Sequence, residues 1–179
     1  MIVTGALHED GLADFADSFG GATREKKFAI MDDSRIGTFG AAALAVSIIV
    51  RVAALAAIFA RSPLAAGLAL IAGEAVSRAA MVRMWHDLPA ARAGSLANDT
   101  GPPDHSAMVV AMAAAVIIVL VALLGLGWRA TGLAAILSIA ATYGAIRLAA
   151  NILGGRTGDT LGACQQVTLA AFLIGASAI

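Results

Sequence analysis

Charged residues, cysteine and aromatic residues are all scarce in this sequence of 179 residues. Charged residues make up 13% of the chain, against about 25% in an average soluble domain, and the net charge is zero. A neutral chain has no general attraction for nucleic acid, so any electrostatic function must be local. The single cysteine, Cys164, excludes an intramolecular disulfide and a multi-cysteine metal site, and we interpret it as a small packing residue.

Apolar residues are abundant instead: they account for 60% of the chain and come in long blocks rich in Ala and Gly. Such blocks are typical of closely packed membrane helices, and about 20 apolar residues in a helix cross the core of a bilayer. The pattern predicts an all-α, polytopic transmembrane helix bundle. Its five expected spans are residues 40–60, 64–84, 106–127, 131–150 and 163–179.

Three polar segments separate these spans: residues 1–39, 85–105 and 151–162. Because an even number of spans lies between any two of them, all three face the same compartment. Positive residues favour the cytoplasm. Outside the predicted spans, six of the eight lie in these segments, namely Arg24, Lys26, Lys27, Arg35, Arg92 and Arg156, against Arg61 and Arg129 on the other side. We therefore predict that the three polar segments are cytoplasmic.

The first polar segment contains Asp10, Asp14 and Asp17 at i, i+4 and i+7. On a helix these carboxylates lie within about 60° of one another, and they repel unless a cation lies among them. Mg²⁺ prefers such oxygen ligands and usually combines one or two carboxylates with substrate phosphates. The spacing predicts a Mg²⁺ site, with a solvated acidic helix face as the alternative. His8 is expected to hydrogen-bond a carboxylate or a phosphate.

Residues 32–40 form the second candidate motif. Arg35 offers a planar fork of donors that suits phosphate, and Ser34 with its neighbouring glycines lets backbone N–H groups turn toward an anion. An arginine for phosphate beside carboxylates for a metal is what phosphoryl transfer requires. The alternative is an ordinary basic cap beside the membrane. Lys26 and Lys27 fit that role, or contact with anionic lipid.

The third motif, residues 154–162, is rich in glycine and contains Gly155, Thr157 and Asp159. It lacks the lysine of a Walker A loop. A flexible turn and a pocket for phosphate or base both fit the pattern. Asp159, among glycines and threonines, is a candidate ligand of a metal or a substrate.

Charged residues within the predicted spans are costly and normally face a partner or a cavity. Glu74 and Arg78 are four residues apart and can form an ion pair on one helix. Arg51 lies in the middle of its span, and the sequence suggests no partner for it. A small transporter built on these three residues is a hypothesis from another functional class, but it leaves the three motifs on the same side unexplained.

Taken in order, residues 8–17, 33–38, 91–94 and 154–163 resemble the adenosylcobinamide-GDP ribazoletransferase family, also called cobalamin 5′-phosphate synthase. The resemblance implies a Mg²⁺-dependent enzyme of the inner membrane with its active site facing the cytoplasm. It also implies the reaction, in which adenosylcobinamide-GDP is joined to α-ribazole or its 5′-phosphate and GMP is released. The implied catalytic residues are Asp10, Asp14, Asp17 and Arg35; the implied substrate-binding residues are His8, Ser34, Arg92, Gly155, Thr157 and Asp159.

The sequence departs from the family pattern at Glu9, where an apolar residue is usual, and at Ser18 and Phe39. Family members also carry membrane segments before the motif at His8, so we expect the chain to be incomplete at its N-terminus. CDP-alcohol phosphotransferases, which act on lipids, share the logic of the three aspartates with a different spacing and are the alternative enzyme class. Besides its small-molecule substrates, the expected partners are membrane lipid and a second copy of the chain, and not nucleic acid.

Overall fold

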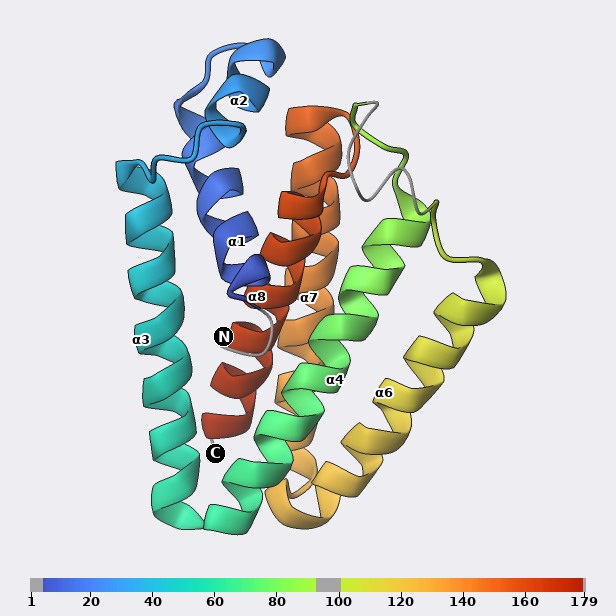
Figure 1. Ribbon diagram of the computed structural model, residues 1–179. Coiled ribbons are helices and arrows are strands. Elements are labelled where there is room, and N and C mark those ends of the chain that lie inside the picture. Colours follow the sequence, from blue (N-terminus) through green and yellow to red (C-terminus); the bar gives the residue numbers. More distant parts are fainter. Residues whose placement is uncertain (1–4, 93–100, 179) are drawn as a thin grey trace.

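The computed structural model describes residues 5–92 and 101–178, and within them it contains helices and no strand (Figure 1). Residues 93–100 of the predicted loop, including Gly94 of the third matched segment, lie outside the described residues. A short 3₁₀ turn at Ser18–Gly20 follows the first helix, which ends at Asp17. The helices are α1 (Leu7–Asp17), α2 (Arg24–Met31), α3 (Thr38–Arg61), α4 (Pro63–Asp87), α6 (His105–Leu126), α7 (Trp128–Leu153) and α8 (Gly158–Ser177).

Five of these helices, α3, α4, α6, α7 and α8, are long and apolar enough to cross a membrane. The predicted all-α bundle with five spans is therefore confirmed. Helices α3, α4, α7 and α8 are longer than the predicted spans because residues at their ends continue the helix, and α6 is displaced by one residue. Asp104 accepts a hydrogen bond from Ala107 N at the start of α6, and Thr157 forms a reciprocal capping box with Thr160 at the start of α8.

Helix α8 lies at the centre of the bundle, between α7, α4, α3 and α1 (Figure 1). Its residues Leu169, Phe172 and Leu173 are fully buried and form the core with Ile58 of α3 and Ala69 of α4. Cys164 is also fully buried on α8, which confirms that it is a packing residue.

The three polar segments meet at one end of the bundle, which we call the polar end. Arg156 N donates to Pro89 O at 2.8 Å, and Ala91 N donates to Arg156 O at 2.9 Å. The guanidinium of Arg24, at the start of α2, donates to Ala91 O at 2.6 Å. The α3–α4 and α6–α7 connections lie at the opposite end (Figure 1). The shared end predicted by counting spans is confirmed, and the compartment it faces stays a prediction.

Helix α1 lies inside the bundle, beside α3 and α8, and does not form a surface loop (Figure 1). Its residues Leu12, Ala13 and Phe15 are buried. The sequence predicts the helix and its row of aspartates, but it gives no sign that the other side of α1 packs against two membrane helices.

Candidate active site at the polar end

Asp10, Asp14 and Asp159 form an acidic cluster where α1 meets the start of α8. The pKa of Asp14 is raised to about 6, first by burial and then by repulsion from Asp10, Asp159 and other nearby carboxylates. Asp159 lies in the first turn of α8, where the positive end of the helix dipole stabilises a carboxylate. The geometry therefore brings together two predicted catalytic residues and a predicted ligand from a distant motif.

Gly11 makes this meeting possible. A Cβ atom on Gly11 would lie 2.9 Å from both the Cα and the O atom of Asp159, which is too close for any other residue without a shift of one helix. Gly162 plays the corresponding part on α8, where a Cβ atom would lie 3.1 Å from the backbone of His8. The two glycines set the separation of α1 and α8, and hence the distance between Asp10 or Asp14 and Asp159.

Asp17 has a different position from the other two aspartates of α1. Its side chain is buried, and it accepts hydrogen bonds from Gly37 N at 2.7 Å and from Gly40 N at 2.8 Å. These amides belong to the start of α3, whose first N–H groups have no partner within the helix. Both oxygens of Asp17 thus cap α3 and fix it to the C-terminal end of α1.

Among the described residues, no group of three or more His, Cys, Asp or Glu side chains is arranged to hold a metal ion. The acidic cluster nevertheless fits a cation that takes only one or two carboxylates and completes its shell with water and phosphate, as Mg²⁺ does. The pKa of Asp14 is raised first by burial and then by the nearby carboxylates, and a cation bound among them would relieve that repulsion.

Arg35 and Ser34 lie on the exposed loop between α2 and α3. The side chain of Arg35 is 86% exposed and donates to Asp33 through Nε at 3.0 Å and Nη2 at 2.7 Å. Hydrogen bonds from Arg35 lower the pKa of Asp33 to about 2. Arg35 and Asp33 line an open cavity of about 430 Å³ that also reaches Asp17. Arg35 is therefore at the polar end but outside the acidic cluster.

The remaining predicted binding residues shape the loops around the cluster. Arg92 holds Asp32 through two hydrogen bonds of 2.6 and 2.5 Å and lies over the ring of Phe28. Gly155 lies so close to Pro89 O that only glycine permits the bridge between the two loops. Thr157 caps α8, and its hydroxyl donates to Asp159 at 3.4 Å.

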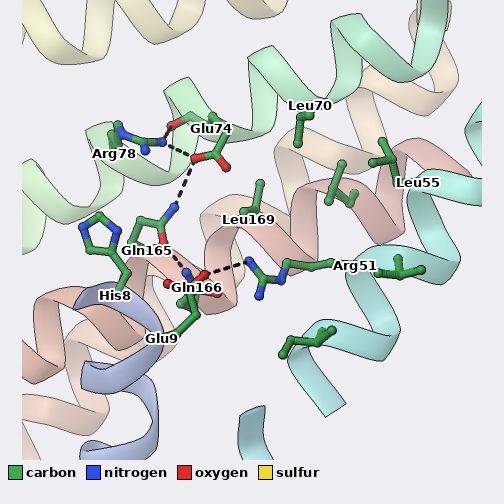
Figure 2. A pocket seen from close by; sticks show the side chains of 13 residues that line it. His8, Glu9, Arg51, Leu55, Leu70, Glu74, Arg78, Gln165, Gln166 and Leu169 are labelled. Carbon is green, nitrogen blue, oxygen red and sulfur yellow. Dashed lines mark hydrogen bonds and ion pairs between the residues drawn. The ribbon is translucent and has the colours of Figure 1, made fainter. Parts of the chain in front are cut away.

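A polar pocket next to the acidic cluster was not predicted from the sequence (Figure 2). It has a volume of about 270 Å³ and lies between α1, α3, α4 and α8. Glu9 pairs with Arg51 at 3.7 Å across it, and the predicted ion pair of Arg78 with Glu74 is confirmed on its far wall. Two features of the sequence point to this pocket: the acidic Glu9 at a position where the resemblance leads us to expect an apolar residue, and Arg51 in the middle of a predicted span.

His8 lines the same pocket, directly before the acidic cluster on α1. Burial and the positive charge of Arg78 lower its pKa below the ordinary value. The imidazole is therefore neutral at neutral pH and can both donate and accept a hydrogen bond.

A model of the cobalamin-5-phosphate synthase family matches residues 1–177 of the chain. The chain is 49% identical to the adenosylcobinamide-GDP ribazoletransferase of Rhizobium meliloti (strain 1021) over 176 residues, which cover 96% of the chain and 67% of that relative. The proteins of the same name from Azorhizobium caulinodans and Brucella melitensis are 46% and 45% identical, over 67% and 68% of their lengths. The chain thus spans about two thirds of these relatives, and no solved structure matches it.

Proposed function

The chain belongs to the cobalamin-5-phosphate synthase family, and from this premise we propose that it joins adenosylcobinamide-GDP to α-ribazole or its 5′-phosphate with release of GMP. The observation that carries the proposal is the acidic cluster, in which two turns of α1 and the start of α8 present carboxylates to one another at the polar end. Such a cluster suits a reaction on a diphosphate, where negative charge must be neutralised and the reacting oxygens aligned.

We propose Mg²⁺ as the cofactor, held by Asp10 of α1 and Asp159 of α8 together with substrate phosphates. When bound, it neutralises charge on the diphosphate. The fit rests on the donor set, since two carboxylates from different helices leave room for phosphate oxygens. Asp17 is a weaker candidate ligand than its position in the sequence implies, because both its oxygens cap α3.

Asp14 is suited to accept the proton in this reaction. A ribose hydroxyl of α-ribazole attacks the phosphorus that carries the cobinamide, the bond from that phosphorus to the GMP oxygen breaks, and the hydroxyl proton passes to the Asp14 carboxylate. A pKa of about 6 is closer to neutral pH than that of an ordinary aspartate, which makes Asp14 a stronger base. We propose that Arg92 and Arg35, at the rim of the same end, bind the leaving GMP phosphate; their present partners, Asp32 and Asp33, form solvent-exposed pairs that a phosphate can replace at little cost.

We further propose that the protein resides in the inner membrane with the polar end in the cytoplasm, as the distribution of Arg and Lys favours. A cysteine in place of the exposed Ser34 tests this orientation, because the only native cysteine is buried. We expect a membrane-impermeant maleimide to label it in inside-out vesicles and not in intact cells. The reverse pattern would place the active site outside.

Two variants expressed from the complete gene separate the proposed roles. Asp10→Asn is expected to raise the Mg²⁺ concentration needed for half-maximal rate, and Asp14→Asn to lower kcat by about 100-fold or more while leaving that Mg²⁺ concentration nearly unchanged. Asp104→Asn, a carboxylate that caps α6 outside the cluster, is the matched control and keeps both values. If both cluster variants turn over like the wild type after normal membrane insertion, the proposed site is wrong.

A further inference from the structure

The polar pocket beside the acidic cluster has two unlike walls. One wall is polar and includes His8, Glu9 and Gln166; the other consists of leucine, isoleucine and valine side chains from α3, α4 and α8 (Figure 2). A pocket of this kind fits a ligand with an apolar body and a polar edge. Its volume of about 270 Å³ is below the roughly 300 Å³ at which pockets for drug-sized ligands begin. A nucleoside is therefore of suitable size, whereas a corrinoid is far too large to enter whole.

The charges of the pocket are compensated within it. Arg51 faces Glu9 at 3.7 Å, and Arg78 faces Glu74 one turn away on α4. A phosphate would have to displace a carboxylate to reach either guanidinium, so the pocket does not favour an anion. These contacts favour an uncharged polar group.

The hydrogen bonds of the pocket leave the buried side-chain oxygen of Gln166 unsatisfied within the described part of the chain. Gln166 Nε2 donates to Gln165 Oε1 at 2.8 Å, and Gln165 Nε2 donates in turn to Ser77 Oγ at 3.1 Å. Gln166 Oε1 has no hydrogen-bond partner among the residues that the structure describes, although the residue is only 2% exposed. Buried acceptors in folded proteins are almost always satisfied. Gln166 lines the pocket and lies between Gln165 and Glu9 on its polar wall (Figure 2).

We propose that this pocket binds the nucleoside part of α-ribazole, the acceptor of the reaction; the inference rests on the proposed function. The aromatic base lies against the aliphatic wall, and a ribose hydroxyl donates to Gln166 Oε1. The pocket is in the right place, because His8 and Glu9 line it and the next residue of α1, Asp10, belongs to the acidic cluster. A nucleoside held there can present a second hydroxyl to the cluster.

The amide side chains of a cobinamide also carry N–H donors, so the test must separate the two substrates. Gln166→Met removes the acceptor and keeps the length of the side chain. We expect it to raise the KM for α-ribazole by about 3- to 10-fold, the loss of one neutral hydrogen bond, and to leave the KM for adenosylcobinamide-GDP within twofold. The matched control is Thr168→Val. It removes a buried hydroxyl group of the same helix that forms a hydrogen bond with Thr142, and it should change neither KM.

A second variant tests the same pocket in case Gln166→Met does not fold. Val52 lines the apolar wall and is 63% exposed on α3, so Val52→Phe adds bulk at the edge of the pocket without disturbing the core. It too should raise the KM for α-ribazole alone. The inference is overturned if either variant raises the KM for adenosylcobinamide-GDP instead, or if both leave the KM for α-ribazole unchanged.

Failure of the inference differs from failure of the proposed function. A wild-type protein that forms no product from the two substrates contradicts the proposed function. A wild-type protein that forms product, with variants that bind α-ribazole normally in calorimetry, contradicts only the assignment of this pocket.

Discussion

At the scale of single residues, Asp14 is the side chain whose chemistry the fold alters most. It is partly buried and faces Asp10 and Asp159, so its protonated form is favoured and its pKa rises from 3.8 to about 6. In the unfolded chain the same carboxyl has its ordinary pKa. The folded state therefore binds a proton more tightly than the unfolded state over this range of pH.

This difference predicts how stability depends on pH. The stabilisation from protonated Asp14 is fully present below about pH 4 and is lost as the pH rises through about 6. Without divalent cations, the thermal unfolding temperature of the detergent-solubilised protein should fall over this range. Asp14→Asn should flatten the fall, and Mg²⁺ should raise the unfolding temperature of the wild type at pH 7.5. An equal fall in the Asn variant would show that another group titrates.

The aspartates also show what the sequence can and cannot predict about a site. Their spacing places three carboxylates on one side of a helix, as the structure has them. It cannot reveal that the N-terminus of α3 comes within reach of Asp17 and takes both of its oxygens, because that contact depends on how two helices meet. Glu9 and Arg51 are missed as a pair for the same reason, since they are 42 positions apart in the sequence.

At the scale of helices, the approach of α1 to α8 positions the acidic cluster. Gly11→Ala places a methyl group 2.9 Å from the backbone of Asp159, and backbone atoms cannot move aside as a flexible side chain can. We expect a loss of about 1–3 kcal/mol in stability, as for overpacked cores, together with a fall in kcat because Asp10 and Asp14 move relative to Asp159.

Gly67→Ala is the matched control, because nothing lies within 4 Å of a Cβ atom at that position of α4. It should leave stability unchanged or raise it by up to about 1 kcal/mol, the difference in helix propensity. Thermal unfolding and single-turnover rates of the two variants check the prediction. Equal behaviour of Gly11→Ala and Gly67→Ala would mean that α1 does not need to approach α8 so closely.

The positions of the helices were largely predictable from the sequence. A long apolar segment in a bilayer must form its backbone hydrogen bonds within the protein, and an α-helix does so within the segment itself. The five predicted spans each correspond to one helix, with ends displaced by a few residues. Helix α1 was predicted only in part. Its aspartates suggest a solvated helix, whereas Leu12 and Phe15 bury its other side in the bundle.

At the scale of the whole molecule, the order of spans along the chain is what assembles the site. Each pair of spans returns the chain to the polar end, so segments far apart in sequence join there through the contacts of Ala91 with Arg24 and Arg156. The polar pocket adjoins the acidic cluster along α1, on the side toward the middle of the bundle, where Arg51 of α3, Glu74 of α4 and Gln166 of α8 line it (Figure 2). A metal and diphosphate site beside a nucleoside pocket is the arrangement that a two-substrate transfer requires.

The most direct test of this account measures which nucleotide is released. The protein, expressed from the complete gene in a host that lacks the activity and placed in nanodiscs with Mg²⁺, is supplied with adenosylcobinamide-GDP and α-ribazole, or with CDP-diacylglycerol and an alcohol. The account predicts GMP and a joined corrinoid product in equal amounts from the first pair, and no CMP from the second. Release of CMP with no GMP would contradict it and indicate a lipid phosphotransferase.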